Sequence, residues 1–151
     1  MTIKLDEYEP IGPDPLVHLA YDINKNAHDK GFYEDPRSFA EAVALIHSEV
    51  SEALEEDRAG RTGLWFQRRD GVRFLENGVY VDPRTGLVYD QPDGPEQGHP
   101  PLKPEGRDVE LLDAMIRILD TLAENVANVD FLVKLKTAYN ASRGHKHGKA
   151  Y

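Results

Sequence analysis

The sequence predicts an all-α protein, a helical bundle of about four helices with a β-hairpin/loop insertion between two of them. Apolar residues recur at helical spacing in four stretches, and hydrophobic residues make up 40% of the 151-residue chain. Glycines and prolines are concentrated in residues 61–105, which hold more than half of their combined number and mark the insertion. We expect a single domain over residues 1–151, with an N-terminal arm over 1–15 and a basic tail over 144–151.

The first two helices are predicted from apolar spacing and from their end signals. Leu16, Leu19, Ala20, Ile23 and Ala27 share one helical face, which predicts a helix over residues 16–30. A second helix is expected over residues 39–59, because Ser38 and Glu41 have capping-box spacing and Gly60 follows the last apolar position.

The insertion is predicted to contain a β-hairpin. Segments 72–75 and 79–81 are rich in β-forming residues and flank Asn77-Gly78, a strong type I′ turn signal. These two segments are therefore expected to pair with each other.

A second turn is predicted at residues 83–86, followed by a short strand over 87–89. At the start of the insertion, the sequence leaves two roles open for Trp65 and Phe66. One role is stacking on a nucleobase, and the other is packing in a hydrophobic core.

The last two helices are expected over residues 107–126 and 130–142. In the first of them, Leu112, Ile116 and Leu119 are predicted to mark the core side. The shorter helix precedes the tail.

Composition excludes several classes of function. The formal net charge of −9 opposes binding to a nucleic-acid polymer, and the absence of cysteine excludes disulfides, thiolate zinc sites and cysteine nucleophiles. No stretch approaches the ~20 apolar residues of a membrane span. The first fifteen residues lack the apolar segment of a secretion signal. We expect a cytoplasmic protein without membrane partners.

Two pairs of carboxylates are the most informative motifs. Glu49 and Glu52 lie three residues apart in one predicted helix, and Glu110 and Asp113 have the same spacing in another. That spacing places each pair on one helical face. Four converging carboxylates need a cation, and oxygen ligands favour Mg²⁺ or Mn²⁺. The alternative is two solvated helix faces, because Glu is a good helix former; the pattern alone does not decide.

Longer segments around these pairs resemble a known family. Residues 48–56 (SEVSEALEE) and 109–120 (VELLDAMIRILD) are similar to the paired motifs of the MazG-like all-α nucleoside triphosphate pyrophosphatases. Residues 136–143 (KTAYNASR), followed by His147-Gly148-Lys149, resemble the C-terminal segment of that family.

The resemblance extends to residues 24–32 in the first helix and covers about residues 16–59 and 105–149. The sequence departs from the family pattern in two respects. The insertion lengthens the gap between the two acidic motifs, and Ser48 stands where some members have an additional Glu.

The resemblance implies a metal-dependent pyrophosphohydrolase that cleaves a nucleoside triphosphate between the α- and β-phosphates. Glu49, Glu52, Glu110 and Asp113 would bind Mg²⁺, with Mn²⁺ as the other possible ion, and Glu49 would activate water. Seven further residues would contact the substrate: Lys136, Tyr139, Asn140, Arg143, Asn24, His28 and Lys149.

The implied role is house-cleaning of the nucleotide pool or control of dUTP or dCTP, in a homodimer or homotetramer. Two alternatives stay open at this level. One is a non-catalytic nucleotide-binding module, and the other is a helical dimerisation module whose acidic residues are merely solvated.

Overall fold

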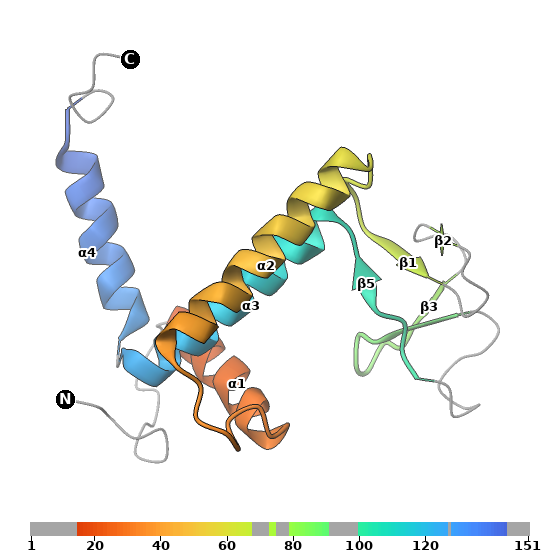
Figure 1. Ribbon diagram of the computed structural model, residues 1–151, viewed down its shortest axis with the longest axis horizontal. Coiled ribbons are helices and arrows are strands. Elements are labelled where there is room, and N and C mark those ends of the chain that lie inside the picture. The colour runs from red at the N-terminus through yellow and green to blue at the C-terminus, as the bar shows by residue number, and fades with distance from the viewer. Residues whose placement is uncertain (1–14, 68–72, 75–78, 91–99, 127, 145–151) are drawn as a thin grey trace. The chain divides into compact units, whose positions relative to one another are not determined.

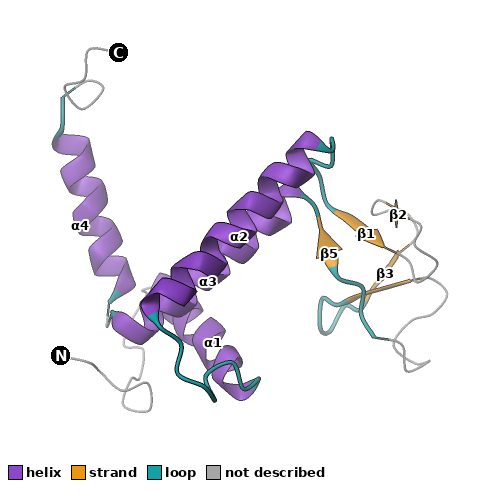
Figure 2. Ribbon diagram, viewed as in Figure 1, coloured by secondary structure: helices purple, strands orange, loops and turns teal. Residues whose placement is uncertain are grey.

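The computed structural model describes residues 15–67, 73–74, 79–90, 100–126 and 128–144 (Figure 1). Its helices are α1 (Pro15–Asp29), α2 (Phe39–Arg58), α3 (Arg107–Asn125) and α4 (Val129–Ser142). Its strands are β1 (Trp65–Gln67), β2 (Arg73–Phe74), β3 (Val79–Val81), β4 (Val88–Asp90) and β5 (Pro104–Glu105). The described part of the protein is therefore mostly helical, with a few short strands between α2 and α3 in the chain (Figure 2).

The four predicted helices are confirmed, and each end lies within one residue of its predicted position. The start of α2 shows why local signals suffice here. The Ser38 hydroxyl accepts a hydrogen bond from the Glu41 N–H at 3.2 Å, and a Glu41 carboxylate oxygen accepts the Ser38 N–H at 2.7 Å. This is the predicted capping box. Within the described residues, none of the helices has the length and apolar character needed to cross a membrane.

The chain divides into two compact units. The first comprises residues 1–43 and 116–151, and the second comprises residues 44–115. Both borders fall inside helices, α2 and α3, so sequence patterning marks neither of them. The expectation of a single domain stays a prediction.

The first unit has a small apolar core between α1, the second half of α3 and the start of α4. Val17, Ala20, Leu119 and Val129 form its buried centre. A buried carboxylate from α4 also supports α1, because Asp130 Oδ2 accepts the Val17 N–H at 2.8 Å. That N–H lies in the first turn of α1, where backbone donors lack a partner within the helix.

The second unit contains all five strands. β1 pairs antiparallel with both β2 and β5, and β3 pairs antiparallel with β4. The predicted hairpin between segments 72–75 and 79–81 is therefore wrong. β2 pairs with β1 and β3 pairs with β4, while Asn77 and Gly78 lie outside the described residues.

The turn at residues 83–86 is confirmed and forms the hairpin between β3 and β4. The buried Asp82 carboxylate accepts the Arg84 N–H at 2.9 Å and the Thr85 hydroxyl at 3.0 Å, and Gly86 has a φ of 71°. An aspartate that caps its own turn stabilises this hairpin. The Asp-Pro-x-x-Gly segment therefore determines the pairing of β3.

Trp65 and Phe66 pack inside the second unit, which answers the question that the sequence left open. Their exposed fractions are 8% and 3%. The Trp65 indole N–H donates to a Glu56 carboxylate oxygen at 3.0 Å, and Arg61 Nε donates to the same oxygen at 2.7 Å. Glu56 therefore anchors β1 to the end of α2, although its helical position predicts a solvated side chain.

Candidate metal centre

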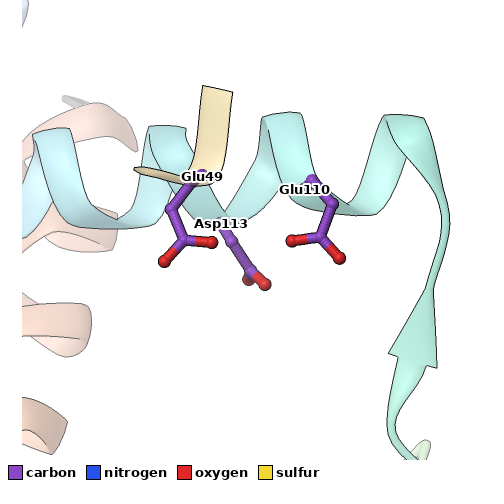
Figure 3. A group of neighbouring side chains, drawn as sticks. All are labelled: Glu49, Glu110 and Asp113. Carbon is purple, nitrogen blue, oxygen red and sulfur yellow. The ribbon is translucent and has the colours of Figure 1, made fainter. Parts of the chain in front are cut away.

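Three of the four predicted carboxylates converge in the second unit. Glu49 on α2 and Glu110 and Asp113 on α3 present oxygen atoms that all lie within 4.8 Å of one another. Figure 3 shows the three carboxylate groups on the same side of α3, with Asp113 between the other two. Glu49 and Glu110 are buried and Asp113 is half-buried. A buried group of this kind could hold a metal ion.

Near the three carboxylates, α2 and α3 each bury one acidic residue and one alanine. Glu49 and Ala53 are buried on α2, and Glu110 and Ala114 are buried on α3, each pair four residues apart. The start of α3 is tied to the last turn of α2, because Arg107 Nη1 lies 3.0 Å from Asp57 Oδ1. This ion pair links the two helices that carry the three carboxylates.

Several large apolar residues of both helices are exposed within the second unit. The exposed apolar residues there are Val50, Leu54, Leu111, Leu112 and Met115. Leu112 and Ile116 were expected on the core side of α3, and both are exposed, whereas the third predicted residue, Leu119, is buried. The buried face of the two helices instead carries Glu49 and Ala53 on α2 and Glu110 and Ala114 on α3.

Glu52 is not part of the converging group. Its side chain is exposed, and its Oε1 accepts a hydrogen bond from the Ser48 hydroxyl at 3.1 Å. Its charge still contributes to the electrostatics of the site, because it raises the pKa of Glu110. The structure therefore supports Glu52 as a neighbour of the three carboxylates.

The site has an unfavourable concentration of negative charge. Burial is the main cause that raises the pKa of Glu110 from 4.5 to about 7. The charges of Asp113, Glu52 and Glu105 raise it further, while Lys103 acts in the opposite direction. A divalent cation would relieve both effects, and a donor set made only of carboxylate oxygens fits a hard ion.

Sequence reasoning missed two charged residues beside this group. Lys103 Nζ lies 3.1 Å from Glu105 Oε1, and the Lys103 charge interacts with Glu110 and Asp113. Partial burial lowers the pKa of Lys103, but the hydrogen bond to Glu105 and the neighbouring negative charges outweigh it, so the pKa is raised. Both residues lie at the end of the predicted 61–105 insertion, where no local pattern indicates a role beside the acidic motifs.

Asn24 and His28, the substrate residues predicted in α1, lie in the first unit. Asn24 is fully buried, and its amide nitrogen donates to Asp120 Oδ1 at 2.8 Å and to Glu124 Oε1 at 2.9 Å. His28 Nε2 lies 2.7 Å from the same Glu124 oxygen. The ring of Tyr33 stacks on His28 with centroids 4.2 Å apart. These side chains form a hydrogen-bonded connection between α1 and α3.

Three of the predicted substrate residues (Lys136, Tyr139 and Asn140) lie on α4 and the fourth, Arg143, directly follows it; all four are exposed in the first unit. Two cations lie near the ring of Tyr139, with Lys136 Nζ 5.4 Å and Arg143 Cζ 5.9 Å from its centroid. The helix and the residue that follows it therefore present Lys136, Tyr139 and Arg143 together, as their spacing predicts. Asn140 is exposed on the same helix, and Lys149 lies outside the described residues.

Comparison with known proteins found no matching family model, no matching curated protein and no matching solved structure.

Proposed function

We propose that this protein is a metal-dependent nucleoside triphosphate pyrophosphohydrolase of the MazG-like kind. The observation that carries the proposal is the group formed by Glu49, Glu110 and Asp113, with oxygen atoms within 4.8 Å of one another. The two paired motifs that resemble the family supply these three residues. A helical bundle with the strands as an insertion is part of the same proposal.

The three carboxylates would hold Mg²⁺ or Mn²⁺, with Glu52 as a further ligand. The bound ion would neutralise negative charge on the triphosphate and on the departing pyrophosphate. Glu49 would accept a proton from the attacking water. The water oxygen bonds to the α-phosphorus, the bond from that phosphorus to the bridging oxygen breaks, and pyrophosphate leaves with the electron pair.

Residues of α4, together with Arg143 directly after it, are the proposed phosphate or sugar contacts. Lys136 and Arg143 supply two exposed cations around Tyr139, and Asn140 adds a hydrogen-bonding amide on the same helix. Cations suit the polyanionic tail of a nucleotide. Lys149 is proposed for the same role on the strength of the family resemblance.

Self-association is also part of the proposal. Each unit exposes apolar side chains: Leu111, Leu112 and Met115 on α3 in the second unit, and Ile116, Ile118, Phe131, Leu132, Val133 and Leu135 on α3 and α4 in the first unit. Exposed apolar surface of this extent is typical of interaction sites. A homodimer or homotetramer would cover it, and a non-catalytic helical dimerisation module is the second function that this observation favours.

Product analysis separates the two functions. The protein is incubated with Mg²⁺ and a panel of ribo- and deoxyribonucleoside triphosphates, and the phosphorus-containing products are identified by ³¹P NMR. Formation of nucleoside monophosphate and pyrophosphate supports the enzyme. Formation of diphosphate and orthophosphate would contradict cleavage at the α-phosphorus. Intact nucleotides together with a stable oligomer would favour the dimerisation module.

A further inference from the structure

Lys103 places a positive charge on the segment that leads into α3, where it is paired with Glu105. Its ammonium lies 3.1 Å from one Glu105 carboxylate oxygen and 3.2 Å from the other, and it interacts electrostatically with Glu110 and Asp113. The Lys103 side chain is 66% exposed. Because the ion pair between Lys103 and Glu105 is so exposed, it contributes little to stability. Stabilisation of the fold therefore does not explain why a lysine lies at this position.

The backbone around Lys103 is fixed on both sides. The preceding Leu102 N–H donates to the Val88 carbonyl at 2.7 Å. The following residues, Pro104 and Glu105, form β5 and pair with β1. A short, paired segment thus carries the lysine, with Glu105 as a tether for its ammonium.

Gly106 fixes the connection from β5 to α3. It has a φ of 120°, and a Cβ atom at this position would lie 2.1 Å from the Gly63 carbonyl oxygen. Only glycine fits so close an approach with that backbone conformation. The chain from Lys103 to Glu110 therefore consists of β5, the conformationally restricted Gly106 and the first turn of α3.

We propose that Lys103 is a phosphate-contacting residue that holds the triphosphate tail of the substrate beside the metal-binding carboxylates. This inference rests on the proposed function. Without a metal ion, the ammonium offsets part of the charge of Glu110 and Asp113. A divalent cation bound by Glu110 and Asp113 would itself neutralise their negative charge. The Lys103 ammonium, which Glu105 holds by an ion pair, would then be available to pair with a phosphate oxygen.

The inference predicts that Lys103 affects anion binding and not metal binding. Calorimetric titration with Mn²⁺ alone measures the metal site in the full-length protein. A second titration, with inorganic tripolyphosphate in excess Mn²⁺, measures phosphate binding without any contribution from a base. Wild type, Lys103→Gln, Lys103→Arg and the control Lys30→Gln are compared, since Lys30 is also exposed but belongs to the first unit. Circular dichroism confirms that each variant is folded.

We expect Lys103→Gln to keep Mn²⁺ affinity at or above the wild-type value and to weaken tripolyphosphate binding about tenfold, the effect of one charge-assisted hydrogen bond. Lys103→Arg should retain most of the binding, and Lys30→Gln should match wild type. Equal tripolyphosphate affinity in wild type and Lys103→Gln would overturn the inference, and so would loss of Mn²⁺ binding in Lys103→Gln. If wild type binds no Mn²⁺, the proposed function itself fails, and that result is distinct from the other two.

Discussion

Glu49 and Glu110 are both buried, and their carboxylate oxygens lie within 4.8 Å of each other. They come from different helices and from opposite sides of the 61–105 insertion. Two buried carboxylates at this distance destabilise one another unless a proton or a cation lies between them. The relationship therefore links the stability of the second unit to occupancy of the proposed metal site.

Glu110→Gln should stabilise the metal-free protein and abolish its response to metal. The variant removes a buried negative charge, so we expect the free energy of unfolding at pH 8 to rise by on the order of 1 kcal/mol. Urea denaturation with and without Mg²⁺ measures both effects. Asp108→Asn, an exposed acid on the same helix, is the control and should keep the Mg²⁺ response. A metal-free Glu110→Gln protein less stable than wild type would contradict this explanation.

The contribution of Glu110 to stability should depend on pH. Its pKa is raised from 4.5 to about 7 in the folded protein. The favourable contribution is therefore fully present below pH 4.5 and is lost as the pH rises through about 7. The difference in unfolding free energy between wild type and Glu110→Gln, measured in chelator from pH 4 to pH 8.5, isolates this residue. We expect the advantage of the variant to grow over that range; a constant difference would show that Glu110 does not titrate as described.

Asn24→Ala should lower the stability of the first unit. The amide of Asn24 is fully buried and donates to Asp120 and Glu124, so truncation leaves both carboxylates without these hydrogen bonds. We expect a loss of about 2 kcal/mol in unfolding free energy. Asn26→Ala, an exposed position on the same helix, should change it by less than about 0.5 kcal/mol. Unchanged stability with lost turnover would instead support direct substrate contact by Asn24.

Gly106→Ala should disrupt the connection between β5 and α3. The new methyl group would meet the Gly63 carbonyl oxygen at 2.1 Å, so the backbone must shift and carry Lys103 and Glu105 with it. We expect a loss of at least about 2 kcal/mol. Gly86→Ala is the matched control, because its φ of 71° is also positive but no atom lies within 4 Å of the added carbon. Thermal melts that show equal losses for the two variants would contradict the close approach.

The parts of the fold that depend on local signals were predictable from the sequence. The Ser38–Glu41 capping box and helical spacing located the helices, and each pair of acids lies on the predicted helix. Pairing between strands was not predictable in the same way. The turn residues Asn77 and Gly78 suggested one partner for β3, whereas Asp82 and the turn that follows it determine another.

The residues around the three carboxylates were also not predictable from the sequence, because their positions depend on contacts between distant segments of the chain. Glu56 is bound by Trp65 and Arg61, although its helical position suggests a solvated side chain. Lys103 directly precedes β5, whose pairing with β1 depends on residues almost forty positions earlier in the chain. Burial of Glu49 and Glu110, in place of the neighbouring leucines, requires the acidic faces of the two helices to meet.

The most direct test of the central claim is pyrophosphate release by Glu49→Gln and by its matched control Glu55→Gln, an exposed glutamate on the same helix. Both are assayed beside wild type on a panel of ribo- and deoxyribonucleoside triphosphates with Mg²⁺, with Mn²⁺ and with chelator. We expect metal-dependent release by wild type and Glu55→Gln, and a loss of at least about a hundredfold in Glu49→Gln, as expected for removal of a metal ligand and general base. Wild-type turnover by Glu49→Gln, or equal release in the presence of chelator, would contradict the claim.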